Sequence, residues 1–108
     1  MLPKANRVDK KAVEDVFRGG KFINSTLLTF KFFRQQTPTP PRVSFVAPKS
    51  VAKKAVDRNK LRRLGYRALE KSFSRIPAGV VGVFLFKKLS NTLLDIENDI
   101  EKIIDKLN

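Results

Sequence analysis

The most concentrated chemistry in this chain is a run of positive charge between Lys49 and Lys71. The run holds nine lysine or arginine residues and only two acids, Asp57 and Glu70. A row of ammonium and guanidinium groups on one helix face is typical of a surface that meets nucleic-acid phosphates. At about 100° per residue of an α-helix, one group of these cations falls within an arc of roughly 80°: Lys53, Lys60, Arg63, Arg67 and Lys71.

Further polar residues lie beside this row. Arg58 and Arg62 fall near the edge of the apolar stripe of the same helix, where the wall of a groove is expected. Asn59 stands between two cations, and we expect it to hold their geometry through polar contacts to RNA or to the loop near Lys49. Because few acids stand four residues away, the charge does not serve intrahelical pairing. We therefore predict RNA contact rather than an ordinary solvated helix face, through Lys49, Lys53, Lys54, Arg58, Asn59, Lys60, Arg62, Arg63 and Arg67.

The composition removes most kinds of protein active site. Cysteine and histidine are both absent, which excludes disulfides, thiol nucleophiles, zinc sites built on Cys or His, and an imidazole base. Asp9, Glu14 and Asp15 cluster at the start of the first expected helix, where capping and the helix dipole account for them. A nuclease built on protein would need two or three converging carboxylates. We therefore predict no catalytic residue and no metal site in this chain.

The overall charge indicates the kind of partner. A net charge of +13 destabilises a compact chain by self-repulsion and favours a polyanionic ligand. Residues 95–108 carry five acids and two lysines, a balance of −3, so the earlier residues carry +16 and should meet that ligand. With 42% hydrophobic residues, we expect one packed domain over 1–108. No run could span a bilayer and no signal peptide is recognised, so we expect a cytoplasmic protein with no membrane contact.

The elements that must position these residues follow from periodicity and from Gly and Pro. We expect an α+β fold, a two-layer sandwich of a small sheet and helices, in the order α-β-β-(β)-α-β-α, where the bracket marks a split of one early strand. Gly65 inside the basic helix costs about 1 kcal/mol relative to Ala. Expected helices cover 9–18, 50–73 and 93–107, and expected strands lie within 22–34, 42–47 and 80–86.

The aromatic residues allow two interpretations. Leu28, Phe30 and Phe32 share one side of the expected strand, and a small sheet cannot hide every phenylalanine of the chain. Bases stacking on aromatic rings contribute about 1–3 kcal/mol each without sequence preference. Phe17, Phe30 and Phe32 are our candidates for such a platform, and the core is an equally good interpretation for each of them.

The segment Ala55-Val-Asp-Arg-Asn-Lys-Leu-Arg-Arg63 resembles the signature of the bacterial ribonuclease P protein subunit. In that family a strand is followed by a lysine pair and by Ala-x-x-Arg-Asn-Arg-x-(Lys/Arg)-Arg at the start of a long helix. The resemblance extends over nearly the whole chain, since Asn6-Arg7, the aromatic strand and the last strand and helix all fit. Four positions depart from the pattern: Lys60 stands for the second Arg and lacks its bidentate fork, Ser50 for a Lys, Val13 for an aromatic residue of the first helix, and Tyr66 for a basic residue.

The resemblance implies a specific role. Family members bind a catalytic RNA, which cleaves the 5′ leader from precursor tRNA with Mg²⁺ held chiefly by the RNA, and no protein partner is required. The leader lies in a cleft between the sheet and the long helix, and a left-handed β-α-β crossover places that helix. For this chain the implied leader cleft is Phe17, Phe30, Phe32, Arg62 and Tyr66. Two alternatives are a plain RNA-binding module, such as a ribosomal protein, and a protein-only nuclease, which the lack of His and of clustered acids disfavours.

Overall fold

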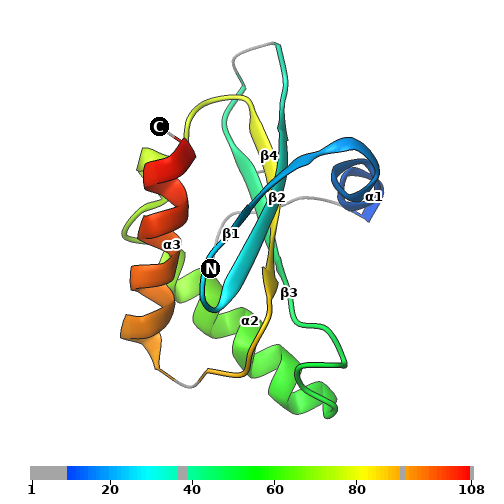
Figure 1. The fold of residues 1–108 in the computed structure, drawn as a ribbon, viewed down its shortest axis with the longest axis vertical. Coiled ribbons are helices and arrows are strands. Elements are labelled where there is room, and N and C mark those ends of the chain that lie inside the picture. The colour runs from blue at the N-terminus through cyan, green and yellow to red at the C-terminus, as the bar shows by residue number, and fades with distance from the viewer. Residues whose placement is uncertain (1–9, 37–38, 91, 108) are drawn as a thin grey trace.

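A mixed four-stranded sheet organises the chain (Figure 1). The computed structural model describes residues 10–36, 39–90 and 92–107, so the expected roles of Asn6, Arg7 and Asp9 lie outside the described residues. Across the sheet the order is β1-β2-β4-β3, with β3 and β4 parallel and the other neighbours antiparallel. The strands are β1 (Lys21–Asn24), β2 (Leu28–Arg34), β3 (Arg42–Val46) and β4 (Val80–Phe86).

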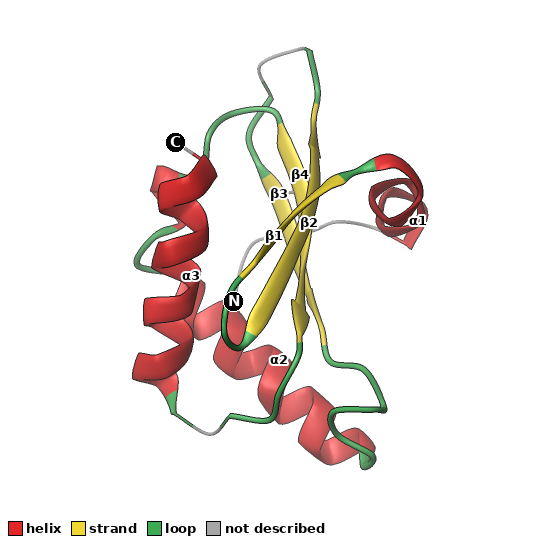
Figure 2. Cartoon of the chain, in the orientation of Figure 1, coloured by secondary structure: helices red, strands yellow, loops and turns green. Residues whose placement is uncertain are grey.

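Helices lie on both faces of this sheet, as Figure 2 shows. On one face are α2 (Ala55–Leu69) and α3 (Leu93–Leu107), and on the other is α1 (Lys10–Gly19). A 3₁₀ turn, η2 (Phe73–Arg75), follows α2. The α+β class and the packing of helices on a small sheet are confirmed, and so is the split early strand, while α1 adds a layer to the expected two. Within the described residues, every helix is too short or too polar to traverse a bilayer.

Alternation along β2 divides its side chains between two cores. Leu28, Phe30 and Phe32 belong to the large core under α2 and α3. Phe33, which points the other way, packs in a smaller cluster with Val16 of α1. Successive strand residues face opposite sides of a sheet, so the parity of a residue decides which core it joins.

The basic helix begins later than its sequence suggests. Residues 50–54 form a turn and a loop in which the Pro48 carbonyl accepts hydrogen bonds from the N–H groups of Val51 and Ala52, 3.0 and 3.1 Å long. The Arg58 guanidinium then donates to the carbonyls of Ala52 and Lys53, at 3.1 and 2.7 Å. Those carbonyls are thus satisfied without a helix. The expected helical positions of Lys53 and Lys54 are wrong, because both residues precede α2.

The connection β3–α2–β4 joins two neighbouring parallel strands, and its left-handed sense stays a prediction. Gly65 explains how closely α2 approaches this part of the sheet. A Cβ at position 65 would lie 2.5 Å from Cδ2 of Phe45, closer than packed atoms allow. The cost of a glycine inside a helix is therefore offset by direct contact between the α2 backbone and the Phe45 ring.

One acid of α3 has a role that its sequence did not indicate. Asp99 is a charged residue of α3 that is nonetheless buried, with 3% of its surface exposed. Its carboxylate accepts from the Ser25 hydroxyl at 2.7 Å and from the backbone N–H groups of Thr26, Leu27 and Leu28 at 3.0–3.2 Å. The turn between β1 and β2 is thereby tied to α3, because four donors satisfy a charge that burial would otherwise penalise.

Candidate nucleic-acid interface

Where α2 and α3 pack on the sheet, its face is closed to a ligand. Phe30 has no exposed surface and stacks on Phe32 and Phe84, with ring centroids 5.3 and 4.3 Å away. Gly82 on the neighbouring strand makes room for it, since a Cβ there would lie 2.3 Å from Phe30 Cζ. The prediction that Phe30 and Phe32 form an open platform on which leader bases stack is therefore wrong, because their strand parity points both rings beneath the helices.

Tyr66 is also part of the core rather than of an open cleft. It is 8% exposed, its ring meets Phe45 edge to face at 5.0 Å, and its hydroxyl accepts the Phe45 N–H at 3.3 Å. Phe45 lies on the edge strand β3, so this hydrogen bond satisfies a backbone donor that β4 does not reach. The expected cleft between sheet and long helix is filled by these side chains, and the assignment of Tyr66 to it is wrong.

The open aromatic surface lies on the opposite face, beside α1. Phe17 projects from α1 with 43% of its surface exposed, and the Lys31 ammonium lies 4.9 Å from its ring centroid. Phe22 of β1 is 63% exposed and stands directly opposite Lys31 in the strand pairing, so both side chains share this face. A cation between two exposed rings suits a base and its phosphate.

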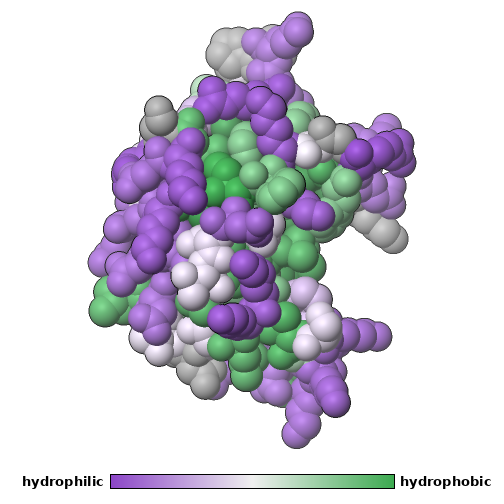
Figure 3. Space-filling model, in the orientation of Figure 1, coloured by the Kyte–Doolittle hydropathy of each residue, from purple (hydrophilic) through white to green (hydrophobic). Residues whose placement is uncertain are grey.

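An apolar floor connects these residues to the rest of the face. Phe33, Val46 and Leu85 are partly buried here and pack on a small core of Val16, Val81 and Val83. The N-terminal end of α2 and the loop before it extend past the sheet on the side of α1 (Figure 1). In Figure 3 the outline of the molecule is hollowed on the right between these two projections, with hydrophobic surface in the hollow and hydrophilic side chains on both rims.

The predicted basic row is present on the outer side of α2. Lys60, Arg63 and Arg67 are exposed and point away from the buried side of the helix. Ion pairs to carboxylates in the described part of the chain involve Lys71 with Glu97, 3.4 Å apart, and Arg75 with Asp105, and none involves a cation that we predict to bind RNA. The charge of the cations that we predict to bind RNA is therefore not neutralised by the described residues and is available to phosphates.

Three residues of the family motif have separate roles in the structure: Arg58, Asn59 and Arg62. Arg58 is partly buried and holds the loop that carries Lys53. Asn59 accepts a hydrogen bond from Arg62, which lies one turn later in α2. Both residues are on the flank of α2 that also carries Tyr66. Among the described contacts Asn59 is paired with Arg62 rather than with the loop near Lys49, and its expected contact with RNA stays a prediction. Arg62 and Asn59 are exposed, and the remaining predicted cations, Lys49, Lys53 and Lys54, are exposed in the loop.

The acids do not assemble a metal site within the described residues, where no group of three potential ligands comes together. Asp99 is used by four donors, and Glu97 and Asp105 face Lys71 and Arg75. Glu14 and Asp15 are exposed on α1. These carboxylates do not fit a resident Mg²⁺, and their lack of a catalytic role stays a prediction.

Sequence reasoning missed Lys31, Phe22 and Phe33. The signal was present in the alternation of β2, where Lys31 stands between Phe30 and Phe32. A lysine on one side of a strand marks that side as open, because lysine is rarely fully buried without a partner. The aromatic residues on the same side as Lys31 were therefore the better candidates for a ligand surface.

Comparison with known proteins gives a family match and matches to solved structures of the same fold. The family model described as Ribonuclease P matches residues 2–108. The RNase P protein of Staphylococcus aureus has a TM-score of 0.80 at 21% identity, covering 95% of each chain. The RNase P protein of Thermotoga maritima has a TM-score of 0.79 at 17% identity, covering 94% of this chain and 97% of the other. A search of curated protein sequences gives no match.

Fold and surface charge together define a small basic α+β protein. The match over residues 2–108 shows its family: the chain belongs to the ribonuclease P proteins. It is accordingly a protein subunit of an endoribonuclease complex of tRNA processing.

Proposed function

We propose that this chain binds the catalytic RNA of ribonuclease P and the 5′ leader of precursor tRNA, and so assists Mg²⁺-dependent removal of the leader. Two observations carry the proposal: a row of cations on α2 that no described carboxylate neutralises, and an open aromatic face beside α1. Phosphate neutralisation supplies affinity without sequence preference. Base stacking is equally tolerant of sequence, which suits a leader that varies between precursors.

The two surfaces bind different RNA partners. The outer row, Lys60, Arg63 and Arg67, meets the phosphates of the catalytic RNA. The face with Phe17 and Lys31 receives the leader: one side of the Phe17 ring is covered by the Lys31 ammonium, and the other side stacks on a base. Arg62 is exposed on the α2 flank nearest β3 and contacts the backbone of the RNA where the two surfaces meet.

We place the catalytic Mg²⁺ on the RNA. Because the described carboxylates do not converge, the protein contributes positive charge, which lowers the Mg²⁺ concentration that the complex needs, and it orients the leader. No proton transfer by a protein side chain is required in this scheme.

The decisive experiment measures cleavage of precursor tRNA at low Mg²⁺ by the protein alone, by a bacterial ribonuclease P RNA alone, and by both together. We expect activity of the mixture to exceed that of either component. Cleavage by the protein alone would support a protein nuclease instead. Tight RNA binding with no gain in cleavage would support the alternative of a plain RNA-binding module.

A further inference from the structure

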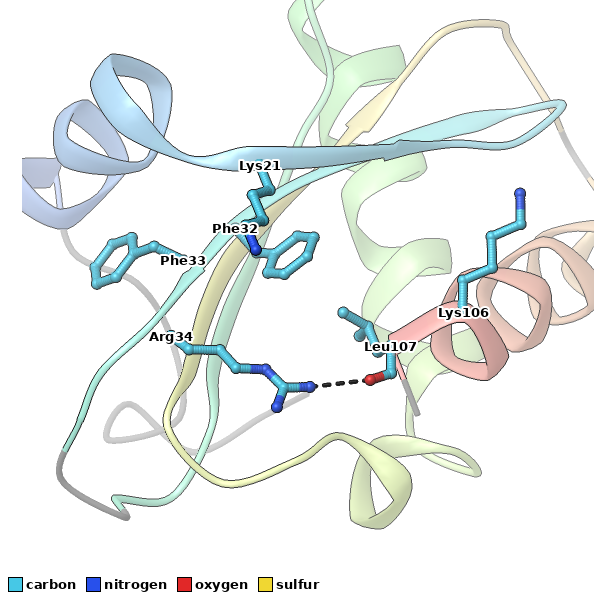
Figure 4. A pocket seen from close by; sticks show the side chains of 6 residues that line it. All are labelled: Lys21, Phe32, Phe33, Arg34, Lys106 and Leu107. Carbon is cyan, nitrogen blue, oxygen red and sulfur yellow. Dashed lines mark hydrogen bonds between the residues drawn. The ribbon is translucent and has the colours of Figure 1, made fainter.

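A second basic surface lies on the far side of the sheet from Phe17 and is not used by the proposed function. A cavity of about 470 Å³ opens between the start of β1, the end of β2 and the last turn of α3. Figure 4 shows Lys21 and Phe32 turned toward α3, while Phe33 points to the opposite side of the sheet. The lining residues are Lys21, Phe32, Phe33, Arg34, Lys106 and Leu107.

The charged side chains that line this cavity are all positive. Lys21, Arg34 and Lys106 are exposed cations, and none of the described residues that line the cavity is acidic. Asp105, the nearest acid along α3, is paired with Arg75. Three cations around one hollow repel one another, and an anion held between them relieves that repulsion.

The donors in the cavity are also held in place. The Arg34 guanidinium donates to the Leu107 carbonyl at 2.9 Å, a contact drawn in Figure 4. A guanidinium has about five N–H donors, and among the described residues only Leu107 accepts from this one. Arg34 is therefore oriented by the end of α3, while most of its donors have no acceptor among the described residues. The slightly exposed Phe32 and the Leu107 side chain give the cavity an apolar wall.

The position of β1 connects this cavity to the aromatic face. β1 is an edge strand of only four residues, so a ligand can pass from one face of the sheet to the other around it. Lys21 pairs with Phe32 on the cavity side, and the next residue, Phe22, pairs with Lys31 on the α1 side. Exposed Phe22 thus continues the Phe17–Lys31 surface to the edge, and Lys21 begins the cavity immediately beyond it.

We propose that this cavity is a nucleotide-phosphate site for the part of the leader that extends beyond the α1 face. This inference rests on the proposed function. The RNA strand leaves Lys31, passes Phe22 at the β1 edge, and places a phosphate among Lys21, Arg34 and Lys106. A long leader therefore reaches cations that a short leader, ending on the α1 face, does not touch.

The test compares precursor tRNAs with a short leader and with a leader several nucleotides longer, bound to the reconstituted complex over a range of salt concentrations. The variant Lys21→Ala with Lys106→Ala removes two cations of the cavity. The control, Lys88→Ala with Lys102→Ala, removes two exposed lysines that do not line it. A second variant, Lys21→Arg with Lys106→Arg, keeps the charge.

We expect wild-type, control and Arg variant to bind the long leader more tightly than the short one. The Lys21→Ala, Lys106→Ala variant should lose this difference, with a salt slope on the long leader smaller by about 0.7 for each phosphate that it no longer binds. Equal behaviour of this variant and the control would overturn the proposal. A titration with inorganic phosphate, followed by NMR, gives a second readout. If phosphate saturates the cavity and leader length has no effect on binding, the site serves small anions and the proposal is also overturned. If wild-type complex does not distinguish precursor from mature tRNA, the proposed function itself fails first.

Discussion

The two faces of the sheet carry the same kind of side chain and use it in opposite ways. Under α2 and α3, Phe30 and Phe32 are buried and stacked on one another. On the α1 side, Phe17 and Phe22 are exposed beside Lys31. Two helices of 15 residues cover the first face, and one helix of 10 residues covers part of the second. Coverage, rather than residue type, therefore separates a core aromatic from one that can meet a ligand.

Truncating an aromatic residue on each face should test this difference most strongly. We expect Phe30→Ala to lower the free energy of unfolding by about 3–5 kcal/mol, because it leaves a cavity in a packed core. Phe17→Ala, on an exposed ring, should lower it by less than about 1 kcal/mol. Urea unfolding followed by circular dichroism measures both, and equal losses would show that the α1 face is also core.

The buried carboxylate offers a second test of the helix-covered face. In Asp99→Asn an amide replaces one acceptor oxygen and sets N–H groups against the N–H groups of the β1–β2 turn. We expect a loss of about 1–3 kcal/mol of unfolding free energy. Asp95→Asn, at an exposed position one turn earlier in α3, is the matched control and should change it by about 0.5 kcal/mol or less. Similar small changes in both variants would mean that the turn does not depend on Asp99.

Substitutions on the open α1 face should instead change the affinity for RNA. We expect Phe17→Ala to weaken binding of precursor tRNA to the complex by about 1–3 kcal/mol, the contribution of one stacked base. Mature tRNA, which has no leader, should bind as before. Phe17→Leu keeps an apolar side chain but no ring face, and it should behave like Phe17→Ala. Equal losses for precursor and mature tRNA would place Phe17 outside the leader site.

The residues of the α2 motif can be assigned to RNA binding or to folding by measuring the salt dependence of binding and the free energy of unfolding separately. Lys60→Ala with Arg63→Ala should reduce the log–log salt slope of binding to the catalytic RNA by about 0.7–0.9 for each phosphate no longer neutralised, with little change in stability. Arg58→Ala should lower the free energy of unfolding by about 1.5–3 kcal/mol, as expected for charge-assisted hydrogen bonds, since Arg58 holds the loop at Ala52 and Lys53. Lys88→Ala is the control for charge, and an unchanged slope in the first variant would contradict RNA contact there.

The smallest effects are expected at the carboxylates. Glu14→Gln, Asp15→Asn and Asp57→Asn should leave the cleavage step within a few fold, because in the proposed scheme the RNA holds the catalytic metal ions and the protein supplies no metal ligand or base. Removing a true one would cost about 10²-fold or more. Single-turnover cleavage at saturating protein and high Mg²⁺ bypasses assembly and substrate binding. A reduction of the larger size with RNA binding intact would assign catalysis to that carboxylate.

Local chemistry made the element types and the basic row predictable. The apolar run of β4 indicates a central strand, and it does pair on both sides. The spacing of Ile96, Ile100, Ile103 and Ile104 identifies α3 and its buried side. Lys60, Arg63 and Arg67 could be assigned to an exposed face because helical periodicity relates residues within one short segment.

Interactions between distant segments decided the rest. The sequence shows that Phe30 and Lys31 point to opposite sides of β2, but only packing decides that two helices cover the Phe30 side. Asp99 is tied to a turn more than 70 residues earlier, Tyr66 to Phe45, and Arg34 to the end of α3. Strand parity and helical periodicity are properties of a few neighbouring residues, so the sequence by itself determined which side chains share a face. Which face is covered depends on where later elements dock, and that is a property of the tertiary structure alone.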